Sequence, residues 1–245
     1  MANLSRLTAQ FDRVLINGDA VDRFEGEEHR DPVAPLVERL KKALACRSGP
    51  PEWITGNHDP LISDAHCAYL EEPALLVFHG DYILDCASPW LPSVHDFRAR
   101  YHAAIRAHPQ GAAFGVRAAL FRRLQIELRP ERFESYGRYG AFFHVLRQGV
   151  RPLRAWRIFE YVWSSPPRVA ELAATYERPV RRVAFGHTHR PGCWQIGALR
   201  LYNTGSFMPF SRSYPVVVEG QEVRQVALGR LLDGLGAQVA LTAPG

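Results

Sequence analysis

The chain has 245 residues, of which 47% are hydrophobic, so it can bury a large core, and intrinsic disorder is not expected. It shows neither a run of the roughly 18 apolar residues that a membrane-spanning helix needs nor a signal-peptide pattern at its start, which predicts a cytoplasmic protein. The net charge of +5 is uneven, because the segment from Arg98 to Arg182 holds 17 arginines, no lysine and six glutamates, a net charge of +11.

Helical and strand patterns alternate along the chain. A short amino-terminal helix is followed by an apolar, β-branched run at 11–17, which predicts a strand. Asp31 and Pro32 are typical of a helix start, and helical spacing of apolar residues predicts a helix over 33–44. Further strands are expected at 51–55, 74–78, 180–185 and 200–204, and a closing hairpin around Glu219-Gly220.

The segment 92–167 has a different character, with arginines and aromatic residues at helical spacing. We interpret it as a helical cap inserted into a single domain of residues 1–245. In one interpretation its arginines are solvated and Trp156, Phe159 and Trp163 form the core of the cap. In another, the basic cap binds a phosphorylated substrate or rests on an anionic membrane, and nucleic acid is the less favoured partner. The four cysteines contain no Cys-x-x-Cys pair, so we expect reduced thiols.

Four polar clusters follow predicted strands: Asn-Gly-Asp at 17–19, Gly-Asn-His-Asp at 56–59, His-Gly-Asp at 79–81 and Gly-His-Thr-His at 186–189. Each alone is typical of a turn. Together they place carboxylate, amide oxygen and imidazole at the strand ends, where α/β folds bind ligands, and these groups suit Mn, Fe or Zn. In an extended segment, His187 and His189 would project to one side and could serve adjacent metals.

In these four clusters the sequence resembles the calcineurin-like metallophosphoesterase family over residues 11–206. The resemblance implies an α/β/β/α sandwich of four layers, here without its first strand, and two divalent metal ions, with Mn first and Fe or Zn as alternatives. It also implies that Asp19 bridges the two ions, that Asn57, His79 and His187 complete one of them, and that His189 binds the other.

The reaction that the resemblance implies is hydrolysis of a phosphoester or pyrophosphate bond by water that two metal ions activate. His58, beside Asn57 in the motif, is the candidate catalytic residue that protonates or stabilises the leaving oxygen. Asp59 is expected to orient His58. Asp22 either hydrogen-bonds to a ligand side chain, which is the favoured interpretation, or only caps the turn that follows it.

The Asp-x-His motif with which the family begins does not precede Asp19, which we interpret as a truncated start rather than a natural loss. With the remaining ligands, the chain is expected to bind one ion tightly and to hydrolyse phosphoesters poorly. His29 and His66 are possible substitute ligands. The alternative is a non-catalytic or one-metal module that uses the fold as a scaffold, but a scaffold would be expected to lose ligands at several places.

The His-Gly-Asp and Gly-His-Thr-His clusters, with a helical insertion between them, also resemble the branch that cleaves UDP-2,3-diacylglucosamine, a nucleotide-linked lipid. That branch typically has Arg where this chain has His58, so a general phosphorylated small molecule is the other candidate substrate. If the lipid is the substrate, the protein would be cytoplasmic and peripheral to the membrane.

Overall fold

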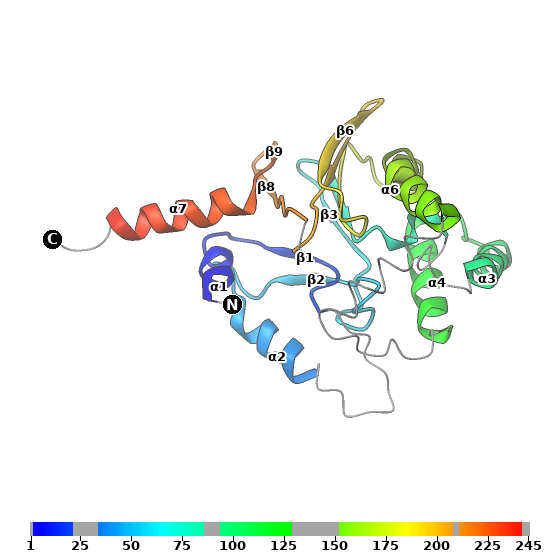
Figure 1. Cartoon of the computed structure of the whole chain (residues 1–245), viewed down its shortest axis with the longest axis horizontal. Coiled ribbons are helices and arrows are strands. Elements are labelled where there is room, and N and C mark those ends of the chain that lie inside the picture. Colours follow the sequence, from blue (N-terminus) through cyan, green and yellow to red (C-terminus); the bar gives the residue numbers. More distant parts are fainter. Residues whose placement is uncertain (1, 22–33, 86–93, 129–151, 208–210, 242–245) are drawn as a thin grey trace. The chain divides into compact units, whose positions relative to one another are not determined.

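The computed structural model describes residues 2–21, 34–85, 94–128, 152–207 and 211–241 (Figure 1). The chain forms two compact units. The first unit comprises Met1–His79 and Val180–Gly245, and the second comprises Gly80–Pro179, within which the expected cap at 92–167 falls.

In its described residues, the first unit consists of strands and three helices. Its helices are α1 (Ala2–Thr8), α2 (Ala34–Ala43) and α7 (Leu228–Leu241), and α1 packs against α7. A mixed five-stranded sheet has the order β3 (Cys67–Leu70), β4 (Leu75–Phe78), β5 (Arg182–Phe185), β7 (Leu199–Asn203) and β6 (Gly192–Ile196). Two smaller sheets are formed by β1 (Leu15–Asn17) with β2 (Glu52–Ile54), and by β8 (Val216–Glu219) with β9 (Glu222–Gln225).

Strand direction determines where the polar clusters lie. In the large sheet, β4, β5 and β7 run parallel, with Val77 opposite Ala184 and Ala184 opposite Tyr202. In the small sheet, β1 and β2 are also parallel. Because parallel strands end at the same edge of a sheet, the loops that follow β4 and β5 leave the large sheet together, and those that follow β1 and β2 leave the small sheet together. These four loops hold the polar clusters predicted from the sequence.

The core of the first unit lies between two layers of strands. Ile54 of β2, Leu75 and Val77 of β4 and Ala184 of β5 form one buried cluster, and Leu15 of β1 packs against it. On the opposite face of β2, Trp53 packs against a second cluster that includes Val37 of α2. One helical layer and two strand layers therefore follow one another in this unit. The predicted α/β class is confirmed.

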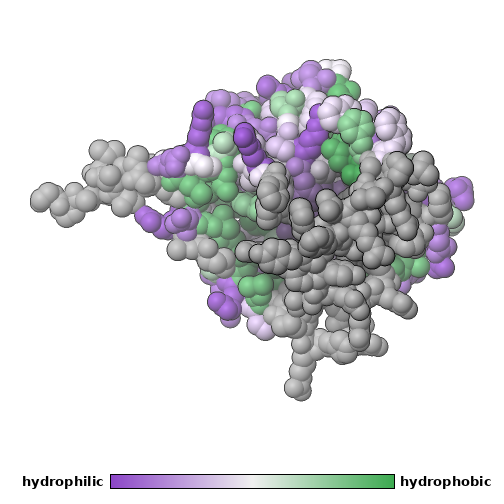
Figure 2. Space-filling model, viewed as in Figure 1, coloured by the Kyte–Doolittle hydropathy of each residue, from purple (hydrophilic) through white to green (hydrophobic). Residues whose placement is uncertain are grey.

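Among the described residues, β1 pairs with β2 alone. Hydrophobic residues lie at the surface where α1 and β1 are placed in this view (Figure 2). An open strand edge with apolar surface around it is the arrangement that proteins usually cover.

Helices form the second unit: the 3-10 helix η1 (Asp81–Leu84), then α3 (Val94–Ala107), α4 (Phe114–Glu127) and α6 (Pro152–Ala173). Its core is aromatic, with Phe121 in edge-on contact with both Phe97 and Tyr101. Helix α6 continues through Pro166 and Pro167, beyond the end expected for the cap. Interior prolines weaken a helix, but the turns after them are held by packing, since Val169, Leu172 and Ala173 are buried.

Three aromatic residues of α6 are not part of that core. Trp156, Phe159 and Trp163 are 63%, 49% and 57% exposed, so the interpretation of these side chains as the core of the cap is wrong. Phe159 stacks on both neighbours, with ring centroids 5.9 Å from Trp156 and 4.8 Å from Trp163. Helical periodicity identifies a shared face correctly, but it does not say whether that face is covered.

Most expected elements are confirmed. Those at 33–44, 51–55, 74–78, 180–185 and 200–204 correspond to α2, β2, β4, β5 and β7, and the predicted hairpin is formed by β8 and β9. Strands β3 and β6 were not expected, and residues 129–151 of the segment with helical spacing at 92–167 lie outside the described residues. Cys46, Cys67 and Cys193 are free thiols. None of the helices described here is both long and apolar enough to cross a bilayer.

Candidate metal centre

The loops at the strand ends have an unusual backbone. Asp19, His187 and His189 all have positive φ angles, of 51°, 60° and 54°. Residues other than glycine rarely adopt this left-handed conformation, and it collects at functional sites because the surrounding structure must hold it there. His187 and His189 therefore do not lie in an extended segment, and the expected alternation along a strand is wrong: β5 ends at Phe185, and a turn follows.

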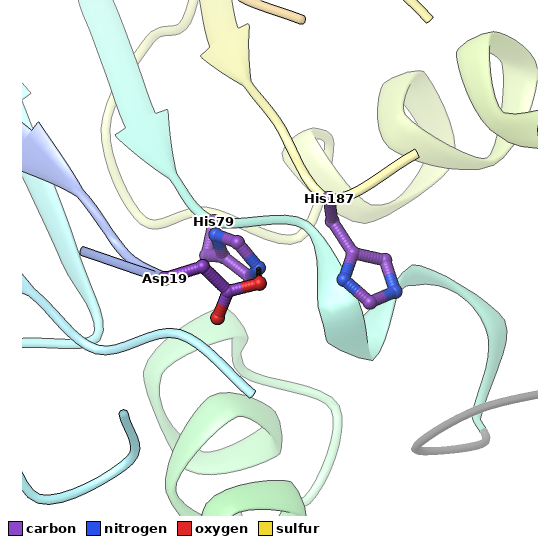
Figure 3. A group of neighbouring side chains, drawn as sticks. All are labelled: Asp19, His79 and His187. Atoms are coloured by element: carbon purple, nitrogen blue, oxygen red, sulfur yellow. Dashed lines mark ion pairs between the residues drawn. The ribbon is translucent and has the colours of Figure 1, made fainter. Parts of the chain in front are cut away.

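Three side chains from three of these loops converge. The metal-binding atoms of Asp19, His79 and His187 all lie within 4.8 Å of one another. Figure 3 shows the carboxylate of Asp19 beside the ring of His79, with the ring of His187 next to them. The Nε2 atom of His79 lies 3.1 Å from Oδ2 of Asp19. The side chain of Asn57 joins the group, because its Oδ1 lies 3.1 Å from Nε2 of His79 and 2.7 Å from Nδ1 of His187.

The hydrogen bond on the far side of His79 determines what this centre can bind. Nδ1 of His79 lies 2.9 Å from the backbone oxygen of Asn17, which can only accept, so Nδ1 carries a hydrogen. In the neutral ring Nε2 is then an acceptor, and it faces the acceptor oxygens of Asp19 and Asn57. Converging acceptors need a positive charge between them, either a proton or a metal ion. Such a carbonyl partner is the usual support of a metal-binding histidine.

The spacing of these atoms also fits a metal. Nitrogen and oxygen ligands lie about 2.0–2.2 Å from Zn²⁺ and similar ions, so two ligands at a right angle are about 3 Å apart. The separations between His79 and Asp19, His79 and Asn57, and Asn57 and His187 are 3.1, 3.1 and 2.7 Å. Carboxylate, amide oxygen and imidazole together suit Mn, Fe or Zn. The residues present therefore fit a divalent ion.

The charge of Asp19 is stabilised inside the centre. Burial alone would raise its pKa, but His79, through charge and a hydrogen bond, and the charges of His58 and His187 outweigh burial and hold the pKa of Asp19 well below its usual range. Its Oδ1 also accepts a hydrogen bond of 2.8 Å from the backbone N–H of His58. The side chain of Asp19 is thus ionised at neutral pH.

Asp59 joins the two loops that carry Asp19 and Asn57. Its buried carboxylate accepts three backbone hydrogen bonds, from the N–H groups of Asp19 at 2.9 Å, Ala20 at 2.7 Å and Gly56 at 2.9 Å. Burial and the neighbouring charge of Asp19 raise the pKa of Asp59, and the backbone donors oppose that rise. The contacts seen for Asp59 therefore fix the backbone around the ligands.

Two glycines allow these loops to approach. A Cβ at Gly18 would lie 2.6 Å from Nδ1 of His79, and one at Gly56 would overlap the carboxylate and backbone nitrogen of Asp19. At Gly18 the positive φ of 70° adds a conformational reason for glycine. Both belong to the predicted clusters, and the structure explains why only glycine fits.

The remaining predicted residues are placed as follows. His58 is exposed, with its backbone bonded to Asp19. His189 is exposed and does not belong to the group of converging side chains formed by Asp19, His79 and His187. Its backbone oxygen accepts a hydrogen bond of 3.0 Å from Ser211 Oγ. Nδ1 of His66 lies 3.0 Å from Oγ1 of Thr55. Asp22 and His29 lie outside the described residues.

The backbone carbonyl of Asn17 was missed at the sequence level, because no residue pattern identifies a main-chain acceptor.

Comparison with known families agrees with this centre. The family model for calcineurin-like phosphoesterases matches residues 2–191, and the chain belongs to that family. It is by family a phosphoester hydrolase that uses divalent metal ions. No curated protein matches the chain.

Proposed function

We propose that this protein hydrolyses a phosphoester or pyrophosphate bond with a metal ion held by Asp19, Asn57, His79 and His187. The observation that carries the proposal is the convergence of acceptor atoms around Nε2 of His79, which needs a cation at its centre. When bound, divalent ions polarise the phosphate and lower the pKa of water.

The protein's own residues supply the rest of the site. Asp19 contributes a carboxylate that is ionised at neutral pH. Asp59 holds the loops of Asp19 and Asn57 together through the backbone. His58 is anchored next to Asp19 by its main chain and is exposed, and we assign it to donate a proton to the leaving oxygen.

A second ion would be held less tightly. Asp19 could bind both ions, and His189, two residues after His187, is the other proposed ligand of the second ion. His189 does not belong to the group of converging side chains formed by Asp19, His79 and His187. With four ligands for the first ion and two named ligands for the second, we expect one tight and one weak site per chain. Calorimetric titration with Mn²⁺ measures both, and two equally tight ions would contradict this assignment.

Variants at the ligands test the site directly. His187→Ala removes a proposed ligand and should abolish the tight Mn²⁺ site. His108→Ala is the matched control, since His108 is an exposed histidine in the second unit, and it should bind as the unaltered chain does. His66→Ala should also bind normally, and loss of the tight ion there would make His66 a ligand instead.

Hydrolysis of bis(p-nitrophenyl) phosphate with Mn²⁺ tests the reaction. His58→Gln should keep metal affinity and lower kcat by about 10²–10⁴-fold for an alkyl phosphodiester, whose leaving group needs a proton. The loss should be much smaller with p-nitrophenolate, which leaves without one. Equal losses with both would remove His58 from the role of proton donor. No turnover by a protein that binds Mn²⁺ would favour the scaffold.

A nucleotide-linked lipid is the finer substrate assignment. The specific observation in its favour is the exposed apolar face of Trp156, Phe159 and Trp163 in a unit rich in arginine, which suits a molecule with both acyl chains and phosphates. An anionic membrane would suit the same surface. Cleavage of a UDP-linked diacyl sugar at a higher kcat/KM than its deacylated form supports this assignment, and equal values would favour a general phosphorylated small molecule.

A further inference from the structure

Asn203, the last residue of β7, lies under the loop of His187 and His189. It is fully buried at 0% exposure, and all its side-chain partners are parts of neighbouring loops. Its Nδ2 donates to the backbone oxygen of Gly186 at 3.1 Å and to Oγ1 of Thr188 at 2.8 Å, and its Oδ1 accepts from the backbone N–H of Gly205 at 2.9 Å. The amide therefore uses both of its ends, and the partners fix its orientation, because a reversed amide would turn its oxygen toward the carbonyl of Gly186 and its nitrogen toward the N–H of Gly205.

The two acceptors of Asn203 are the two ends of one tight turn. The backbone N–H of Thr188 donates to the oxygen of Gly186 at 2.7 Å, and His187 between them has a φ of 60°. A hydrogen bond across a single residue with positive φ is the rare and strained form of the γ-turn. Such a conformation persists only where other contacts hold it. Asn203 supplies two of those contacts, one at each end of the turn.

We propose that Asn203 is the positioning residue that holds His187 in its metal-binding orientation. The proposal rests on the proposed metal site, because it concerns how the chain presents a ligand of that site. His187 projects from the centre of the turn, and its Nδ1 meets Oδ1 of Asn57 at 2.7 Å. If the turn relaxes to an ordinary backbone conformation, the imidazole leaves this position.

Asparagine has the chemistry that this position requires. The turn presents the carbonyl of Gly186, which can only accept, and the following loop presents the N–H of Gly205, which can only donate, so the side chain must donate to one and accept from the other. Aspartate matches asparagine in size but has no hydrogen to donate when ionised. The backbone of Asn203 is anchored separately, because its oxygen accepts a bond of 2.6 Å from Nε2 of Gln225.

Three variants separate positioning from general stability. Asn203→Asp keeps the bond from Gly205 and places a carboxylate oxygen against the carbonyl of Gly186. Thr188→Val removes one acceptor and leaves the other. Gln225→Ala is the matched control, since it removes a hydrogen bond to the same residue without touching its side chain. For each, we would measure the Kd for Mn²⁺, the melting temperature, and the NMR couplings and carbon shifts that report φ at His187 in metal-free protein.

We expect Asn203→Asp to weaken Mn²⁺ binding by about 10–100-fold, the usual range for residues that orient ligands, and to remove the left-handed NMR signature of His187. Thr188→Val should change both in the same direction by less, and Gln225→Ala should change neither.

Unchanged Mn²⁺ affinity and φ in Asn203→Asp would overturn the proposal, as would weaker binding with the left-handed signature intact. If Asn203→Asp does not fold, Thr188→Val decides between the same outcomes. If the unaltered chain binds no Mn²⁺, the proposed metal site fails, and the NMR comparison alone decides whether Asn203 holds the turn.

Discussion

The second unit contains a buried ion pair whose removal should be costly. Arg122 of α4 and Asp81 of η1 have side chains that are 4% and 0% exposed. Nη2 of the guanidinium donates to Oδ1 of Asp81 at 3.2 Å, and Nη1 lies 2.8 Å from Oδ2 and donates to Oε1 of Gln125 at 2.6 Å. Arg122→Met keeps most of the volume and removes the charge, so the carboxylate of Asp81 is left buried without its partner.

The expected loss follows from that geometry. Breaking one side of a buried ion pair typically costs about 3–5 kcal/mol, because an uncompensated charge remains in the interior. For a chain of this size each kcal/mol corresponds to about 2–4 °C, so the melting temperature should fall by roughly 6–20 °C. Replacing both partners, as in Asp81→Asn with Arg122→Met, should recover a large part of the loss, since no charge is then buried.

Circular dichroism with temperature measures the four members of this cycle. The matched control is Arg123→Met, one residue along α4, where the ion pair to Glu127 is exposed, with Arg123 at 74%. It should not change the melting temperature measurably, because water replaces the lost partner. If Arg122→Met behaves like Arg123→Met, or if the double variant is no more stable than the single one, the reasoning is refuted.

Three further outcomes concern the metal centre. Gly56→Ala should abolish tight Mn²⁺ binding in a folded protein, because the added Cβ would overlap the carboxylate of Asp19. Gly115→Ala is the control and should bind Mn²⁺ normally, since a Cβ there has open space around it. Intact Mn²⁺ binding in Gly56→Ala would contradict the close approach of Gly56 to Asp19. Removal of metal with EDTA should lower the melting temperature, and Mn²⁺ at 100 times its Kd should restore about 2.7 kcal/mol of the free energy of unfolding. A melting temperature that does not change with Mn²⁺ would count against a metal site in the folded protein. Asp59→Asn should weaken Mn²⁺ binding because an amide nitrogen cannot accept from the backbone of Ala20 or Gly56, and Asp64→Asn, at an exposed position, is its control.

The strand ends were predictable from the sequence, and the reason is geometric. Apolar runs such as 75–78 and 182–185 are fully or largely buried strands, and each is followed at once by polar residues. Parallel pairing then brings the following loops to one edge of a sheet. This brings His79 and His187 together, since both follow strands of the large sheet, whereas Asp19 follows β1 of the small sheet and reaches them because the two sheets pack face to face.

The backbone of the loops could not be predicted in the same way. In a strand, alternation would place His187 and His189 on one side. The strand ends before these residues, however, and both have positive φ angles. Histidine adopts a positive φ more often than most residues do, but still too rarely for the sequence alone to place that conformation at 187 and 189. The turn is imposed by Asn203, which lies 16 residues beyond His187 in the sequence and meets the turn only after β7 pairs with β5.

The same physical reason explains the supports of the other ligands. Asp59 fixes the loop of Asp19, which lies 40 residues away in the sequence, through backbone N–H groups that no residue pattern reveals. Asn17 fixes His79 through its own carbonyl, over 62 residues. Ligand types are determined by side-chain chemistry and can be identified in the sequence. Their orientation depends on main-chain groups brought together by strand pairing, so substitutions at Asn203 and Asp59 should weaken the metal centre while every proposed ligand remains in place.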